Sequence, residues 1–183
     1  MPQRPRHRPG FTLIELMIVV CILGVIASIA ITSLGGYLRR ARTAEAAQNL
    51  NALFKSASAL YVSERASRGI SSSVVTNCVA EPTALMPSDP SGDKQRFTPV
   101  DGFLQLNFRI ADYVYFGYGL SSLGSAGSIT CLDAPSSAAI YTFYANGDLD
   151  GDGRRSTFEM AVSSDEANQL KHSRGLYIVA EPE

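Results

Sequence analysis

The chain has 183 residues, which is enough for one long helix and one compact domain of ordinary size. Its 16 basic and 17 acidic side chains give a formal net charge of -1. This balance does not support binding of a nucleic-acid backbone, which requires clustered Lys and Arg.

A short basic segment precedes a long apolar run at the N-terminus. Arg4, Arg6 and Arg8 come first, and Glu15 is the only charged side chain between Phe11 and Leu38. The apolar run has about the ~20 residues that a helix needs to span a bilayer. Because positive charge holds the flanking end in the cytoplasm, we expect the rest of the chain to lie outside the cytoplasm.

A secretory signal peptide would show the same basic start and apolar stretch, followed by cleavage at a small-residue site. Ser28-Ile29-Ala30 could serve as this site and would leave Ile31 as the new N-terminus. We disfavour this alternative because the apolar run passes without a break into an amphipathic helical pattern. An acidic residue near the start of a signal core would also be unusual.

The segment Gly10 to Val20, GFTLIELMIVV, resembles the class III leader and N-terminus of type IV pilins and pseudopilins. The resemblance implies cleavage between Gly10 and Phe11 by a membrane prepilin peptidase, N-methylation of Phe11, and polymerisation with identical subunits by a pilus assembly machinery. It also implies a precursor in the inner membrane and a mature subunit in an extracellular pilus. Where many relatives have a proline, this chain has Thr32.

Cleavage after Gly10 would change the charge of the chain in two ways. It would leave 13 basic against 17 acidic side chains, and it would create a cation, the α-amine of Phe11. A carboxylate in an apolar helix is costly unless it meets a positive charge. We therefore expect Glu15 to pair with the Phe11 amine one turn away, in its own chain or in a neighbouring subunit, and so to guide assembly. The alternative is that Glu15 only extends to the lipid headgroups.

The helical pattern continues beyond the apolar run. Apolar residues recur at three- and four-residue steps: Leu50, Leu53, Phe54, Ala57, Leu60 and Tyr61. We expect one helix over residues 11–65, about 80 Å long at 1.5 Å per residue. Its first part, about 11–34, would span the membrane, and its amphipathic part, 37–65, would pack on a globular domain over 66–183.

The cysteines favour an oxidising compartment. Cys21 lies in the apolar run and is expected to be a small buried hydrophobic residue. Cys78 and Cys131 lie in loop-like segments of the exported part and are one candidate disulfide, with two free thiols as the alternative.

The remainder favours a β-rich domain. Four prolines within 66–102 exclude a long helix and predict an irregular connection: Pro82, Pro87, Pro90 and Pro99. Strand patterns follow at 104–110, 113–118, 140–145, 157–162 and 176–180. The Gly- and Ser-rich stretch 117–128 is predicted to be a flexible turn. Four or five antiparallel strands packed on the helix give an α+β fold, the pilin αβ-roll.

Residues 148–159 match the calcium-loop pattern D-x-D-x-D-G-x5-E. The predicted Ca2+ ligands are the carboxylates of Asp148, Asp150, Asp152 and Glu159 and the backbone carbonyl of Arg154. Because the flanks look like strands, we expect a calcium-stapled hairpin loop rather than an EF-hand. The alternative is a solvated acidic turn.

No catalytic constellation is present. His172 is the only histidine beyond the first ten residues, and with Ser173 and Asp165 it forms no triad signature. We therefore expect a structural pilus subunit rather than an enzyme; adhesion, twitching motility and DNA uptake are implied only by the resemblance. The alternatives are a type II secretion pseudopilin and a membrane-anchored calcium-binding module that does not polymerise.

Overall fold

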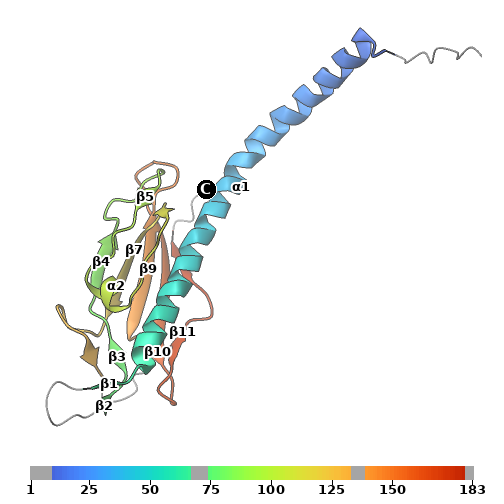
Figure 1. Ribbon diagram of the computed structural model, residues 1–183. Coiled ribbons are helices and arrows are strands. Elements are labelled where there is room, and N and C mark those ends of the chain that lie inside the picture. The colour runs from blue at the N-terminus through green and yellow to red at the C-terminus, as the bar shows by residue number, and fades with distance from the viewer. Residues whose placement is uncertain (1–9, 67–73, 133–138, 180–183) are drawn as a thin grey trace, which may run out of the picture. The chain divides into compact units, whose positions relative to one another are not determined.

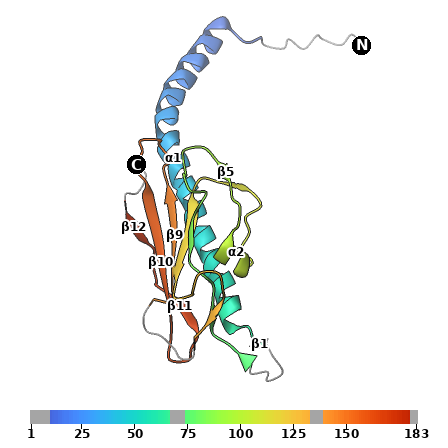
Figure 2. The same cartoon turned by 90° about the vertical axis from the view of Figure 1, so that its left-hand side faces the viewer.

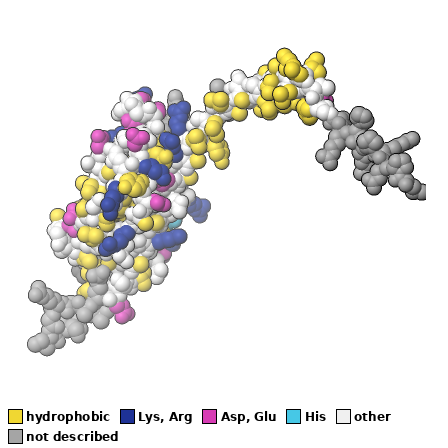
Figure 3. All heavy atoms as spheres, turned by 45° about the horizontal axis from the view of Figure 1, so that its top comes forward, with side chains coloured by type: hydrophobic (Ala, Val, Ile, Leu, Met, Phe, Trp, Pro, Cys, Tyr) yellow, Lys and Arg dark blue, Asp and Glu magenta, His cyan; other side chains and the backbone are white. Residues whose placement is uncertain are grey.

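A computed structural model describes residues 10–66, 74–132 and 139–179. The chain divides into two compact units, Met1–Leu38 and Arg39–Glu183, and helix α1 (Leu13–Val62) contributes to both. The predicted long helix is thus present, with ends two and three residues inside the expected bounds. In the first unit, Leu13–Ile31 is long and apolar enough to cross a membrane, with a mean hydropathy of 2.8 and none of it buried. Figure 3 shows hydrophobic side chains gathered along this segment.

The second unit is built on one antiparallel sheet of six strands in the order β11-β10-β9-β7-β4, with β12 also paired to β10. The strands are β4 (Thr83–Met86), β7 (Gly117–Ser122), β9 (Tyr141–Gly147), β10 (Ser156–Ser164), β11 (Leu170–His172) and β12 (Tyr177–Val179). The part of α1 after Arg39 lies across one face of this sheet (Figure 1). The α+β class is confirmed, with six strands in the main sheet rather than four or five.

Alternating burial directs one face of the sheet toward the helix. In β10, Phe158, Met160 and Val162 are buried, and the residues between them are more exposed. They join the helix residues Leu50 and Leu53 in a single hydrophobic core. Removing this apolar surface from water is the main force that holds the helix on the sheet.

The stretch 117–128 contains a strand that its composition concealed. The prediction of a flexible turn is wrong for Gly117–Ser122, because β7 is an interior strand between β4 and β9. Its glycines leave room for neighbours: a Cβ on Gly119 would lie 2.2 Å from the ring of Tyr144, and one on Gly117 would lie 2.4 Å from the carbonyl oxygen of Pro87. Here glycine permits close packing rather than mobility.

The strand predicted over 104–110 is also absent. The chain instead forms a short helix, α2 (Asp101–Gln105), and Leu104 is exposed. Phe103, Leu106 and Phe108 are buried, and Phe97 packs edge-on against Phe103 and Phe108 with ring centroids 5.3 and 5.5 Å away. Contacts within this aromatic cluster outweigh the two-residue alternation that suggested a strand.

Short strand pairs occupy the connections of the second unit. They are β1 (Arg65–Ala66) with β2 (Val74–Val75), β3 (Cys78–Val79) with β8 (Thr130–Cys131), and β5 (Gln95–Arg96) with β6 (Tyr113–Val114). The connection predicted to be irregular, 66–102, therefore contributes strands, and β4 among them joins the main sheet. The β3–β8 pair places Cys78 opposite Cys131.

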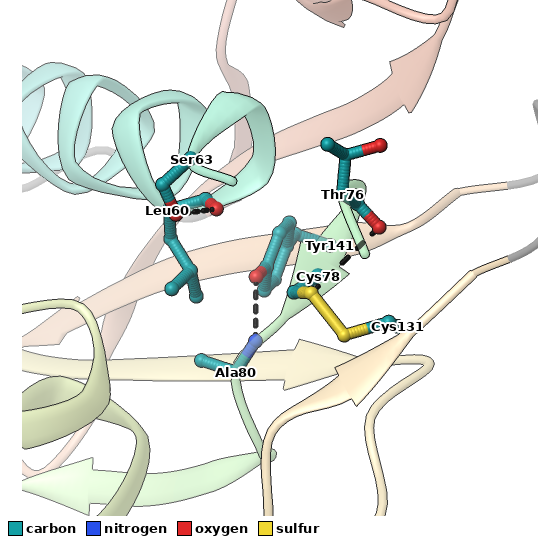
Figure 4. Close-up of a disulfide and its surroundings, with 7 residues drawn as sticks. All are labelled: Leu60, Ser63, Thr76, Cys78, Ala80, Cys131 and Tyr141. Carbon is teal, nitrogen blue, oxygen red and sulfur yellow. Dashed lines mark hydrogen bonds between the residues drawn. A yellow bond between two sulfur atoms is a disulfide. The ribbon is translucent and has the colours of Figure 1, made fainter. Parts of the chain in front are cut away.

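The predicted disulfide between Cys78 and Cys131 is confirmed (Figure 4). Beside it, the buried backbone N–H of Ala80 donates a hydrogen bond of 2.7 Å to the hydroxyl oxygen of Tyr141. Burial raises the pKa of Tyr141 above its usual value, so this hydroxyl stays neutral. The disulfide thus joins β3 to β8, and the Ala80 hydrogen bond links the end of β3 to β9 of the main sheet.

Candidate functional site

The residues of the predicted processing and assembly site lie together at the start of α1. Gly10 and Phe11 precede the first helical residue, Leu13, and both are exposed. One carboxylate oxygen of Glu15, Oε2, accepts hydrogen bonds of 2.9 Å from the Thr12 N–H and 2.6 Å from the Thr12 hydroxyl. The Glu15 N–H is 3.3 Å from the Thr12 hydroxyl oxygen.

This geometry is a capping box, in which two side chains satisfy N–H groups that the first helical turn leaves free. This role of Thr12 was not predicted, although its signature, Thr-x-x-Glu before an apolar run, is visible in the sequence. The remaining carboxylate oxygen of Glu15, Oε1, accepts no hydrogen bond within the described residues. Glu15 can therefore cap its own helix and still present one oxygen to an amine.

The acidic loop brings together three of the five predicted calcium ligands. One oxygen from each of Asp148, Asp150 and Asp152 lies within 4.8 Å of the others. Gly151 and Gly153 have positive φ angles, 74° and 83°, which let the chain turn sharply between the acids. Three carboxylates this close repel one another unless a cation lies between them.

Backbone N–H groups already orient these carboxylates. The N–H groups of Gly151 and Gly153 lie 2.8 and 3.0 Å from the two oxygens of Asp148. The N–H of Arg154 donates a 2.6 Å hydrogen bond to Asp152. These hydrogen bonds, made between residues of the loop, fix its backbone conformation.

Glu159 lies outside this group. It is the fourth residue of β10, opposite Tyr144 of β9 and Tyr177 of β12. In an EF-hand the chain turns into a helix that directs its last ligand back to the ion, whereas here a regular strand continues away from the loop. Any cation held by the loop would therefore rely on the three aspartates and on backbone carbonyls.

Two arginines lie beside the acidic loop. The Nη1 atom of Arg39 is 4.0 Å from a carboxylate oxygen of Asp150, and Arg155 forms an ion pair with Asp89. The pairing explains the arginine at position 155, where an EF-hand usually has an apolar residue. The side chains of both pairs are at least 36% exposed, so each pair contributes little by itself to the free energy of unfolding.

A polar network that the sequence did not reveal joins α1 to the sheet. Glu45 accepts hydrogen bonds of 3.0 Å from the Tyr115 N–H and 3.2 Å from the Tyr118 hydroxyl, and Asn49 donates one of 2.7 Å to the same hydroxyl. Burial raises the pKa of Tyr118, so the hydroxyl remains a neutral donor. The Arg42 guanidinium lies 4.5 Å from the centroid of the Tyr115 ring.

The three residues considered for a triad are engaged elsewhere. Asp165 pairs with Lys171 at 2.8 Å, and this hydrogen bond holds the pKa of Asp165 below its usual value. The ring of His172 packs edge-on against Phe54 of α1, with centroids 4.6 Å apart. Ser173 donates a hydrogen bond to the carbonyl of Gly175.

Comparison with known proteins indicates which class of protein this arrangement resembles. Residues 5–31 match the family described as the prokaryotic N-terminal methylation motif. The match covers the predicted cleavage site, Phe11 and Glu15. A chain with this N-terminus, a candidate membrane-spanning helix and an α+β domain has the organisation of a pilin.

Several known proteins are similar to the first part of the chain. The chain is 54% identical over 50 residues to the type IV major pilin protein PilA of Myxococcus xanthus, which is 27% of this chain and 22% of that protein. It is 46% identical over 48 residues to a fimbrial protein of Pseudomonas aeruginosa, 26% and 31% of the two chains. It is 56% identical over 36 residues to the type IV major fimbrial protein FimA of Dichelobacter nodosus, 20% and 22%.

The matched part of the chain thus spans between about a fifth and a third of the length of these relatives. No solved structure matches the chain. The motif and the relatives together support the type IV pilin family, whose members are structural proteins and not enzymes. The resemblance drawn from GFTLIEL is therefore confirmed.

Proposed function

We propose that this protein is the structural subunit of a type IV pilus, made as an inner-membrane precursor and polymerised through the first part of α1. One observation carries the proposal: Leu13–Ile31 exposes its apolar side chains on every side of the helix while its single carboxylate lies at the start. Outside lipid, such a surface requires equivalent apolar neighbours. A bundle of identical helices supplies them.

Glu15 has a specific part in this assembly. After cleavage, the amine of Phe11 would lie one turn from the carboxylate, and Oε1 of Glu15 is free to meet the amine of an adjacent copy. A pair of opposite charges inside an apolar bundle is strongly favoured over either charge alone. The pair would fix the axial register between adjacent subunits.

The decisive experiment separates this charge from helix capping. Filaments would be counted by electron microscopy for Glu15→Gln, which removes the charge but keeps a capping acceptor, and for Thr12→Ala, which weakens the cap but keeps the carboxylate. We expect Glu15→Gln to abolish filaments and Thr12→Ala to retain them. Normal assembly of the Glu15→Gln protein would reject the proposal for Glu15.

Processing is tested by the mass of the N-terminal peptide. Methylated Phe11 supports the pilus subunit, whereas Ile31 indicates a secretory signal and an intact Met1 or Pro2 indicates a permanent membrane anchor. Long surface fibres that disappear on gene deletion identify a pilus, and loss of protein secretion identifies a pseudopilin. Adhesion, twitching motility and DNA uptake are then assayed in the deletion strain as uses of the fibre.

We also propose that the loop 148–152 binds Ca2+. The support is the group of three carboxylates and the two glycines that let the loop close around an ion. Calorimetric titration of the detergent-solubilised chain should show calcium binding that Asp150→Asn weakens and Asp112→Asn leaves unchanged. Because Asp112 is an exposed acid outside the loop, it is the matched control. Absence of a calcium signal from the unaltered chain would reject the site.

A further inference from the structure

The face of the sheet opposite α1 carries a cavity of about 450 Å³ beside β12. Its walls combine one carboxylate, hydroxyl groups and an aromatic ring; the principal lining residues are Thr142, Glu159, Ser173, Leu176 and Tyr177. They come from β9, β10, the segment between β11 and β12, and the first residue of β12. Figure 2 shows β12 beside β10 at this edge of the sheet.

Glu159 lies in a row of aromatic residues that crosses three strands. Tyr144 of β9 and Tyr177 of β12 are its direct partners on the two sides, so all three side chains project from the same face. The Tyr144 ring lies over Gly119, and burial raises the pKa of its hydroxyl. Glu159 is thus a carboxylate flanked by two tyrosines and half-buried among them.

No cation of the described residues neutralises this carboxylate. Within the described residues, the side chain of Glu159 takes part in no ion pair and no hydrogen bond, although Arg174 lies next in sequence to two lining residues, Ser173 and Gly175. A partly desolvated carboxylate without a partner is costly, and an adjacent aromatic face favours a cation further. The cavity therefore has the chemistry of a site for an ammonium or guanidinium group.

The rim of the cavity is an exposed apolar edge. Tyr177, Ile178 and Val179 are 65%, 43% and 44% exposed, and β12 pairs only with β10 among the described strands. A strand with one free edge and a continuous apolar sequence is a surface for contact with another chain. Tyrosine is enriched among the residues that contribute most to binding at protein interfaces.

We propose that this face binds a second copy of the chain, which places an arginine or lysine side chain against Glu159 and the Tyr177 ring. The chain itself supplies the complementary charge. Six cations make no side-chain ion pair, hydrogen bond or ring contact among the described residues: Arg40, Lys55, Arg96, Arg109, Arg154 and Arg174. Contact between two different patches of identical chains repeats without closing and builds a fibre. The inference rests on the proposed filament and adds a contact between globular domains.

Site-specific cross-linking tests the contact directly. A photoreactive benzoylphenylalanine would replace Tyr177 in the full chain, and Leu104, an exposed apolar residue of α2, is the matched control. In assembled filaments we expect position 177 to cross-link to a peptide of a neighbouring copy that contains an arginine or lysine. If position 177 gives no intermolecular product, or none beyond that of position 104, the contact does not exist.

Charge reversal tests the role of Glu159. We expect Glu159→Lys to weaken assembly by about tenfold or more per contact, as loss of a charged hydrogen-bonded partner does. The exposed Glu166 lies at the next turn without a pairing partner among the described residues, so Glu166→Lys makes the same charge change and should assemble normally. Replacing the cross-linked cation by glutamate should restore assembly of Glu159→Lys.

The outcomes separate this inference from the pilus proposal and from calcium binding. If the unaltered protein forms no filaments, the pilus proposal fails. If it forms filaments and the Glu159→Lys and Glu166→Lys proteins assemble equally well, only the cation contact is rejected. Calcium affinity and melting temperature should be unchanged in Glu159→Gln, since Glu159 lies outside the acidic loop; a loss of calcium binding would assign Glu159 to the metal instead.

Discussion

The two parts of α1 share one helical backbone and have opposite surfaces. In the first unit the large apolar side chains from Leu13 to Ile31 are exposed, whereas in the second unit Leu50, Leu53 and Tyr61 are buried on the sheet. The first part is apolar all round, and the second has a single apolar stripe. The sheet of the same chain buries the apolar stripe of the second part. A helix that is apolar on all sides needs lipid or other copies of the chain around it.

The largest expected effect distinguishes these two kinds of burial. Leu53→Ala should lower the free energy of unfolding of the second unit by about 2–5 kcal/mol, because it leaves a cavity in the core. Leu23→Ala, in the exposed apolar part, should leave this unfolding unchanged and reduce filament yield. Thermal unfolding of the detergent-solubilised chain measures the first effect. Equal destabilisation by both substitutions would contradict the comparison.

Loss of the disulfide is expected to affect the second unit alone. The bridge joins residues separated by 53 positions, so replacing Cys78 and Cys131 by serine should cost about 2–4 kcal/mol. Unfolding with and without reductant measures this cost in the unaltered protein. Cys21→Ser is the control, because Cys21 is a free cysteine and should leave the reductant effect intact.

Glycine substitutions also test the difference between the exposed first part of α1 and the packed second unit. Gly119→Ala should destabilise the sheet by about 1–3 kcal/mol, since the added Cβ would overlap the Tyr144 ring. Gly24 lies in the exposed part of α1 with no atom near an added Cβ. There, alanine should leave the melting temperature of the second unit unchanged. A neutral Gly119→Ala would show that Tyr144 moves aside without cost.

The smallest expected effect is a change in the stability of the second unit at acid pH. Hydrogen bonding to Lys171 lowers the pKa of Asp165 from its ordinary value of 3.8, so the folded state holds this proton more weakly than the unfolded state does. The resulting stabilisation is complete above the ordinary pKa and is lost as the pH falls through the lowered one. In the Asp165→Asn protein, the free energy of unfolding should therefore fall slightly less steeply as the pH drops below about 4. An unchanged acid profile would show that the pair contributes nothing.

Sequence patterns predicted the features that depend on neighbours along the chain. The apolar run, the helical stripe and the alternation in 157–162 each report a local period, and the structure contains the corresponding elements. The Asp148 to Asp152 grouping was also visible, because these aspartates share one short loop. Cys78 and Cys131 were paired by eliminating Cys21, without any local period.

Features that depend on distant neighbours were not predictable in this way. Gly119 lies in an interior strand because β7 pairs with both β4 and β9, and Glu45 is fixed by Tyr118, 73 residues further along the chain. The stretch 104–110 alternates like a strand, yet the aromatic cluster around Phe97 sets its conformation. Glu159 fits the calcium pattern by spacing, but strand pairing carries it onto the sheet face.

The start of α1 also explains how a protease could recognise this chain. The bond between Gly10 and Phe11 lies outside the first helical turn, and the residues on both sides of it are exposed. A protease binds its substrate in an extended conformation, so hydrolysis of the Gly10–Phe11 bond would not require α1 to unwind. The Thr12–Glu15 cap marks where the non-helical backbone that contains this bond ends and the helix begins.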